Sequence, residues 1–111
     1  MSVIFLPEVR KYYYHLEEIL YDKGYLGFKE SSRSYVQKLI NDIETTLPIR
    51  PHRPAPVYFD KYGKDMKYAI FRVGKSKHTT WYAFFKTYKE HGEIVYVARY
   101  IANNHIIAQY L

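Results

Sequence analysis

Four of the five prolines lie between residues 48 and 56, and they divide the chain into two parts with different apolar patterns. Before this segment, apolar residues recur every three or four positions, as on one face of a helix. After it, apolar and aromatic residues form runs separated by short turns, which is typical of strands. Proline fixes its own backbone and restricts the residue before it, so we expect residues 48–56 to be a stiff, extended connection. The helices should therefore precede this connection, and most strands of the sheet should follow it.

The first part is predicted to hold a short strand at residues 2–6 and two helices. Pro7 suits the first helical position, and Glu8 suits the positive end of the helix dipole. The first helix should run from Pro7 to Lys23 with Gly24 as its stop, and the second from about Lys29 to Leu47 with Pro48 ending it. The expected buried faces are Val9, Tyr12, Tyr13, Leu16, Ile19 and Leu20 on the first helix, and Tyr35, Val36, Leu39, Ile40, Ile43 and Leu47 on the second.

The second part is predicted to form three strands, at residues 66–73, 79–88 and 93–101. The turns between them are short, so the strands should form an antiparallel meander, and the apolar tail of residues 102–111 should pack back on the body. Residues 58–65 are prone to turns. The expected fold is a single α+β domain over residues 1–111, in the order β-α-α-β-β-β. A helical hairpin covers one face of a small, mainly antiparallel sheet, and the other face is expected to be partly open.

Composition limits the cellular compartments and the kinds of site that are expected for the protein. The chain has 111 residues and no cysteine, so disulfides and thiolate metal sites are excluded. The apolar run at residues 3–6 is too short for a signal peptide, and no stretch is long enough to cross a membrane. The five histidines show no metal-ligand spacing, and no phosphate-binding glycine loop is present. We expect a cytoplasmic protein that uses no metal or cofactor and does not associate with a membrane.

The basic charge is concentrated in the second part of the chain. The net charge is +6, and residues 50–99 contain eleven Lys and Arg but only four Asp and Glu. Fourteen tyrosines, six phenylalanines and one tryptophan supply many flat rings. Such a surface favours nucleic acid, the ribosome or an acidic protein as partner. The alternative is ordinary solubilising charge around an aromatic core.

Nearly the whole chain resembles the RelE/ParE toxin superfamily. The resemblance lies in the order of the elements, the size, the basic charge, and the meander sequences KYAIFRVGKSKHTTWYAFF and IVYVARYIANNHIIAQYL. It implies a bacterial toxin that a cognate antitoxin protein holds inactive. RelE-like members cleave messenger RNA on the ribosome without a metal, and ParE-like members inhibit DNA gyrase instead.

Metal-free RNA cleavage needs a base, an acid and cations that stabilise the developing charge. The resemblance places these roles on the late strands and the C-terminal segment, where the candidate catalytic residues are Arg72, His78, Arg99, His105 and Tyr110. The candidate residues for binding the RNA backbone are Lys75, Lys77 and Lys86. Each has a structural alternative: a carboxylate partner for the arginines, hydrogen bonding for the histidines, packing for Tyr110 and a solvated turn for Lys75 and Lys77.

One departure from the RelE-like pattern keeps other functions open. RelE-like toxins carry lysines on the first meander strand, where this chain has Ala69 and Phe71. A lysine-based mechanism is therefore disfavoured, and arginine and histidine become the more favoured catalytic residues. The departure also raises the gyrase alternative. A binding module or decayed toxin without toxicity is the third hypothesis.

Overall fold

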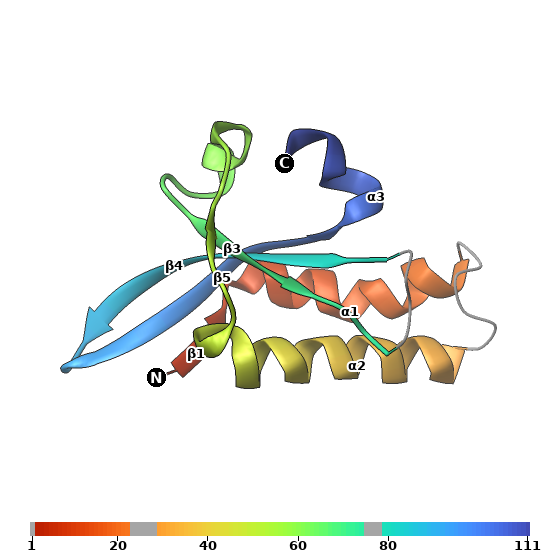
Figure 1. The fold of residues 1–111 in the computed structure, drawn as a ribbon. Coiled ribbons are helices and arrows are strands. Elements are labelled where there is room, and N and C mark those ends of the chain that lie inside the picture. Colours follow the sequence, from red (N-terminus) through yellow and green to blue (C-terminus); the bar gives the residue numbers. More distant parts are fainter. Residues whose placement is uncertain (1, 23–28, 75–78) are drawn as a thin grey trace.

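The meander strands lie at the centre of a five-stranded sheet in the computed structural model of the chain, which describes residues 2–22, 29–74 and 79–111 (Figure 1). The strand order is β1-β5-β4-β3-β2. The strands are β1 (Ser2–Phe5), β2 (Arg53–Pro54), β3 (Lys67–Phe71), β4 (Trp81–Glu90) and β5 (Glu93–Asn103). Among these strands β1 pairs with β5 in parallel, and the other pairings are antiparallel. The predicted α+β class is confirmed.

Two helices, α1 (Pro7–Asp22) and α2 (Lys29–Thr46), lie side by side on one face of the sheet (Figure 1). Their apolar side chains pack against Phe71, Trp81 and Phe85 of the central strands. The Trp81 indole is also satisfied inside this layer, because its Nε1 donates to the Tyr35 hydroxyl at 2.8 Å. The helix-facing residues are buried or half-buried as predicted, namely Val9, Tyr12, Tyr13, Leu16, Tyr35, Val36, Leu39, Ile40, Ile43 and Leu47.

Ile19 is the exception among the described residues of these two faces, because 37% of its surface is exposed. The buried stripe of α1 follows Val9, Tyr13 and Leu16, at intervals of four and three residues. Ile19 lies ten residues after Val9, on the flank of this stripe, so the sheet does not cover it. Leu20 and the predicted stop at Lys23 and Gly24 fall outside the residues or side chains that the structure describes.

The β4–β5 hairpin is longer than predicted. Glu90 pairs with Glu93, so only His91 and Gly92 form the turn. Both have positive φ angles, 52° and 82°, as a two-residue turn of type I′ requires. The predicted four-residue turn at 89–92 was too wide, because Lys89 and Glu90 still belong to β4.

The proline-rich connection contains short elements that were not predicted. A 3₁₀ turn, η1 (Leu47–Ile49), follows α2, and β2 then pairs with Tyr68 and Lys67 of β3. Pro54 is tolerated in β2 because this strand is at the edge of the sheet. A second 3₁₀ segment, η2 (Val57–Tyr62), leads into Gly63.

The second face of the sheet is covered in part, so that Phe84 and Ala102 are buried on it while Ile70, Tyr82 and Tyr100 are half-buried. Figure 1 shows η2 and the C-terminal segment, α3 (Asn104–Ile107) and η3 (Ala108–Tyr110), on the side of the sheet opposite the helices. They enclose a second apolar cluster of Phe59, Met66, Tyr68, Phe84, Ala102 and Ile107. The tail packs back as predicted, but chiefly through Ile107, because Ile106 and Leu111 are 51% and 40% exposed.

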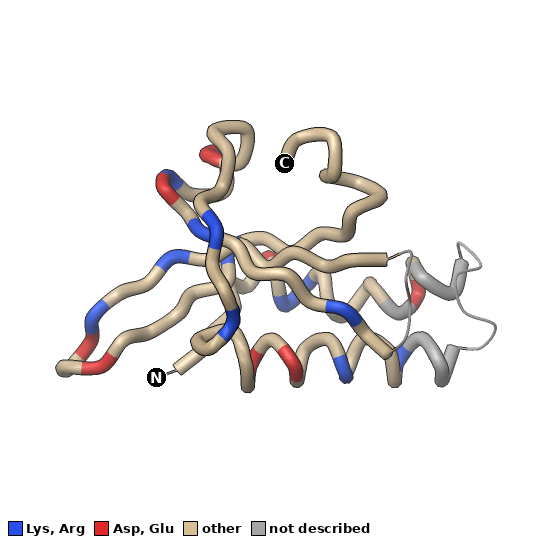
Figure 2. The backbone as a smooth tube through the Cα atoms, viewed as in Figure 1, with Lys and Arg blue, Asp and Glu red and all other residues tan. Residues whose placement is uncertain are grey.

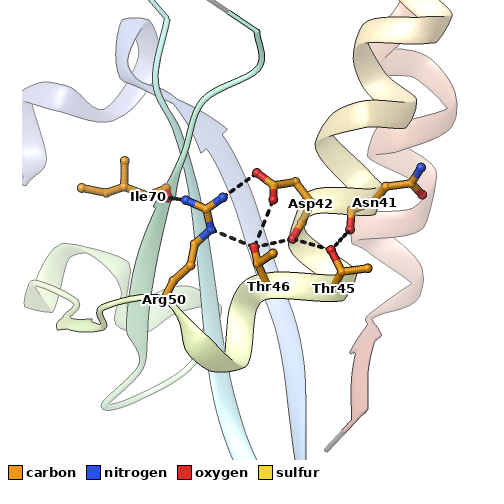
Figure 3. Close-up of polar contacts among 6 residues, drawn as sticks. All are labelled: Asn41, Asp42, Thr45, Thr46, Arg50 and Ile70. Carbon is orange, nitrogen blue, oxygen red and sulfur yellow. Dashed lines mark hydrogen bonds and ion pairs between the residues drawn. The ribbon is translucent and has the colours of Figure 1, made fainter.

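Arg50 joins the helical layer to the sheet (Figure 3). Its Nη2 lies 2.6 Å from Asp42 Oδ2 on α2, and its Nη1 donates to the Ile70 carbonyl of β3 at 3.1 Å. Its Nε donates to the Thr46 hydroxyl at 2.8 Å, and its guanidinium lies 4.3 Å from the centre of the Phe71 ring. Arg50 therefore serves the fold, although it belongs to the basic part of the chain.

Candidate functional site

Arg99 occupies a β-bulge in the middle of the sheet. Phe85 of β4 pairs with Ala98, but Phe84 pairs with Tyr100, so Arg99 is an extra residue on β5. A bulge bends its strand and redirects a side chain, and bulges are common beside active sites. This bulge lets a cation lie inside an otherwise apolar strand without entering either core cluster.

The Arg99 guanidinium is held by the backbone of η2. Its Nε donates to the Tyr62 carbonyl at 2.8 Å, and its Nη1 has a longer contact of 3.5 Å with the Tyr88 hydroxyl. The side chain is half-buried, and no carboxylate pairs with it among the described residues. The remaining N–H groups suit an anionic oxygen, since arginine always carries its charge.

Gly63 makes this approach possible. A Cβ atom at this position would lie 2.7 Å from Arg99 Nε and 3.1 Å from its Cδ. Such separations are too short for non-bonded heavy atoms, so any other residue here would displace the arginine. The turn sequence Lys61-Tyr62-Gly63 thus supplies a carbonyl acceptor and the space for its donor.

Arg99 lines a pocket of about 480 Å³, which we call the Arg99 pocket. Its walls come from the start of α1, from η2, from β5 and from α3. The lining residues are Leu6, Glu8, Val9, Tyr12, Lys61, Tyr62, Arg99, Tyr100, Ile101, Ala102 and Ile106. The pocket therefore combines two cations, one carboxylate, three tyrosines and an apolar wall.

The tyrosines of the Arg99 pocket are hydrogen-bond donors rather than bases. Tyr62 and Tyr100 stack with ring centres 3.9 Å apart. Burial raises the pKa of Tyr100, and hydrogen bonding with Tyr62 adds to that rise. Burial also raises the pKa of Tyr12 to about 12. Both phenols keep their protons at neutral pH, so they can donate to a ligand oxygen but cannot accept a proton from a hydroxyl.

Lys61 links the pocket to the C-terminal end. Its Nζ lies 4.1 Å from the centre of the Tyr58 ring, and Tyr58 stacks on Tyr110 with ring centres 3.7 Å apart. Hydrogen bonding with Tyr58 raises the pKa of Lys61, and the same interaction lowers the pKa of Tyr58. Lys61 is therefore fully charged at neutral pH. Tyr110 packs against η2 and does not line the pocket. Packing was the alternative to a catalytic role for this residue.

The predicted catalytic residues that the structure describes, Arg72, Arg99, His105 and Tyr110, do not come together in one site. Arg99 lines the pocket, whereas Arg72 is exposed just after the end of β3. His105 is the second residue of α3, where its Nε2 lies 3.2 Å from the Thr79 hydroxyl and its backbone N–H donates to Asn103 Oδ1. His105 does not line the pocket, although its neighbour Ile106 does.

Of the predicted RNA-binding lysines, the structure describes Lys86, which does not line the Arg99 pocket. Lys86 lines a different hollow of about 300 Å³, beside His52 and Lys67. Lys75, Lys77 and His78 lie outside the described residues. Figure 2 shows Lys and Arg along the strands, in the loop above the sheet and on the helices, with acidic residues in the same loop, on the helices and at the hairpin tip.

Sequence reasoning missed five polar residues of the Arg99 pocket: Glu8, Tyr12, Lys61, Tyr62 and Tyr100. Glu8 and Tyr12 were assigned to the dipole and the core of α1, and residues 58–65 were identified only as a turn. Lys61 next to Tyr62 and Gly63 was a weak signal of an exposed, cation-bearing turn. No periodic pattern connects that turn with β5, because they meet only through the folded sheet.

Comparisons with protein families, with curated proteins and with solved structures find no match to this chain. Within the described residues, no three His, Asp or Glu side chains gather where they could hold a metal ion. No helix in the described part of the chain is long and apolar enough to cross a membrane. The function must therefore be argued from the geometry of the site.

Proposed function

We propose that this chain is the toxin of a bacterial toxin–antitoxin pair, and that it cleaves messenger RNA on the ribosome without a metal. The observation that carries the proposal is the placement of Arg99, a half-buried cation held by the Tyr62 carbonyl on the wall of a tyrosine-rich pocket. A nearby second cation, Lys61, strengthens the case. Fixed cations beside aromatic rings suit the phosphates and the bases of single-stranded RNA.

The chemistry would divide among several side chains. Attack by the ribose 2′-hydroxyl builds negative charge on the phosphate, and the Arg99 guanidinium would stabilise that charge. Tyr12 and Tyr100 would donate hydrogen bonds to phosphate or leaving-group oxygens. Proton transfer would fall to a histidine, for which His105 and His78 are the candidates.

The fold and the charge distribution also support the proposal. A helical hairpin covers one face of the sheet, and the basic residues concentrate in the part of the chain that builds the meander. An acidic antitoxin in the cytoplasm would hold such a toxin inactive by charge complementarity. The ribosome would present the message, since a site with dispersed catalytic groups relies on its partner for positioning.

A second candidate function follows from the separation of the predicted groups. Arg72, Arg99 and His105 lie in different places, and an incomplete catalytic set favours a toxin that binds its target without RNA chemistry. DNA gyrase is then the target. A non-toxic, decayed form of the same fold would bind neither target productively.

Induced expression in a bacterial host, with new RNA 5′ ends mapped within minutes, tests these alternatives. We expect cuts inside translated codons, and we expect Arg99→Ala to remove them. Arg10→Ala is a matched control, because Arg10 is exposed on α1 and does not line the Arg99 pocket. Growth arrest with intact messages and a DNA-damage response would favour gyrase. Growth without arrest would favour the decayed form.

A further inference from the structure

We propose that the Arg99 pocket binds one ribonucleotide, with its phosphate at Arg99 and Lys61 and its base against the apolar wall. This inference rests on the proposed function, and it adds the unit of RNA that the site recognises.

The size of the pocket fits a single nucleotide. Its volume is about 480 Å³, which lies within the range of roughly 300–1,000 Å³ found for small-molecule sites. The walls come from four separate segments of the chain, so the pocket is closed on several sides rather than being a flat strip. A nucleotide turned out of a single strand can enter such a space, whereas an intact base pair cannot.

The cationic side of the pocket is built for a phosphate. Arg99 uses its Nε on the Tyr62 carbonyl at 2.8 Å, which fixes the plane of the guanidinium before any ligand arrives. Its Nη groups then offer a paired set of donors, the arrangement that suits phosphate oxygens. Lys61 stands at the exposed rim of the pocket, where its ammonium group can reach the same phosphate.

The opposite side of the pocket offers an apolar surface for a base. Leu6, Val9 and Tyr12 contribute it from the start of α1, and Ile106 contributes it from α3. Ile106 is 51% exposed, which leaves apolar area for a flat ring to cover. The Tyr12 hydroxyl can donate to a base or ribose oxygen.

Glu8 sets the orientation in which a nucleotide would lie in the pocket. Among the described residues of the lining it is the one carboxylate, and it lies on the α1 side together with the apolar wall. A carboxylate repels a phosphate but accepts hydrogen bonds from base amino groups and ribose hydroxyls. The phosphate is therefore directed to the Arg99 side and the nucleoside to the α1 side.

Titration of the ¹⁵N-labelled protein with AMP, CMP, GMP and UMP, followed by NMR, tests this inference. We expect at least one nucleotide to bind tenfold or more tightly than inorganic phosphate or the free nucleoside. The shifts should concentrate at the Arg99 Nε signal and at the amides of Tyr62, Tyr100 and Ile101. Arg99→Ala should weaken binding at least tenfold, and Arg10→Ala less than twofold. If Arg99→Ala does not fold, Lys61→Ala at the exposed rim should still weaken binding about threefold.

The inference is overturned if phosphate alone binds as tightly as every nucleotide, if the shifts lie outside the pocket, or if both arginine variants weaken binding equally. Its failure is distinct from that of the proposed function. Codon-level cleavage in cells without nucleotide binding would remove the inference and keep the function. Nucleotide binding in the pocket without any cleaved message would keep the inference and remove the function.

Discussion

At the scale of single residues, the candidate site depends on how closely the Arg99 side chain approaches the backbone at Gly63. The hydrogen bond to the Tyr62 carbonyl at 2.8 Å requires the arginine to pass where a Cβ atom of residue 63 would lie. The position of the cation is thus set by a residue that carries no functional group.

We therefore expect Gly63→Ala to reduce message cleavage by about 10²-fold, since a shift of roughly 1 Å in a positioned group can cost that much. The variant keeps every charge of the protein, so a change in overall electrostatics would not explain the loss. The rate of cleavage after induction measures it. Gly92→Ala is the matched control, because it also adds a methyl group at a positive φ, 82°, but meets no atom within 4 Å. Equal activity of the two variants would contradict the positioning role.

The same sequence signal led to two different outcomes at this scale. Arg72 and Arg99 were both named as candidate catalytic residues, with a carboxylate partner as the alternative. Arg99 instead donates to the Tyr62 backbone carbonyl, and Arg72 lies beyond the end of β3 and is exposed. The bulge that distinguishes Arg99 arises from pairing with β4, and pairing is not visible in a single strand's sequence.

At the scale of elements, local rules predicted the long elements well. The spacing of apolar residues fixed both helices, and the glycine-containing turns located β4 and β5, because these signals act within a few residues. The short elements, β2 and η2, were missed. Their conformations are decided by β3 and by the second apolar cluster, which lie far along the chain.

Arg50 offers a test of how these elements are joined. Arg50→Ala should lower the free energy of unfolding by about 2 kcal/mol, since hydrogen bonds to charged groups contribute roughly 1.5–3 kcal/mol and this side chain also packs on Phe71. Asp42→Ala should cost about 1 kcal/mol, and the two losses should not add, because the side chains are ion-paired at 2.6 Å. Urea unfolding of the single and double variants measures this coupling. Strict additivity would show that the pair contributes nothing.

At the scale of the whole molecule, the sheet is a central layer with a different cover on each face. The helices protect one face, and η2 with the C-terminal segment protects the other (Figure 1). The tail was predicted to pack back on the body, but η2 was identified only as part of a turn-prone segment, so its place in this cover was not predicted. It is nevertheless this cover that creates the Arg99 pocket, whose walls include η2 and α3.

The many buried tyrosines should make the fold sensitive to alkali. Burial raises the pKa of Tyr12 to about 12 from an ordinary value of 10.0, and it raises those of Tyr13, Tyr35 and Tyr100 as well. A raised folded-state pKa contributes stability that is complete below the unfolded value and is lost as pH rises through the folded value. The free energy of unfolding should therefore fall from about pH 10 upward, by about 2 kcal/mol for Tyr12 alone.

Urea unfolding between pH 8 and pH 12 measures this loss. Tyr12→Phe should flatten the decline, whereas Tyr14→Phe should leave it unchanged because the Tyr14 side chain is 73% exposed. A decline of the same steepness in Tyr12→Phe would mean that this phenol is not the group that resists ionisation in the fold.

We propose that Arg99 acts on RNA held by a ribosome, and a reconstituted translation reaction tests this proposal. The purified protein is added to a defined message with and without ribosomes, and the cleavage rate is compared between the wild type and Arg99→Ala. We predict cuts within codons only when ribosomes translate the message, with a rate lower by about 10²–10³-fold for Arg99→Ala. An intact message with the wild type, or equal cleavage by both proteins, would contradict this account.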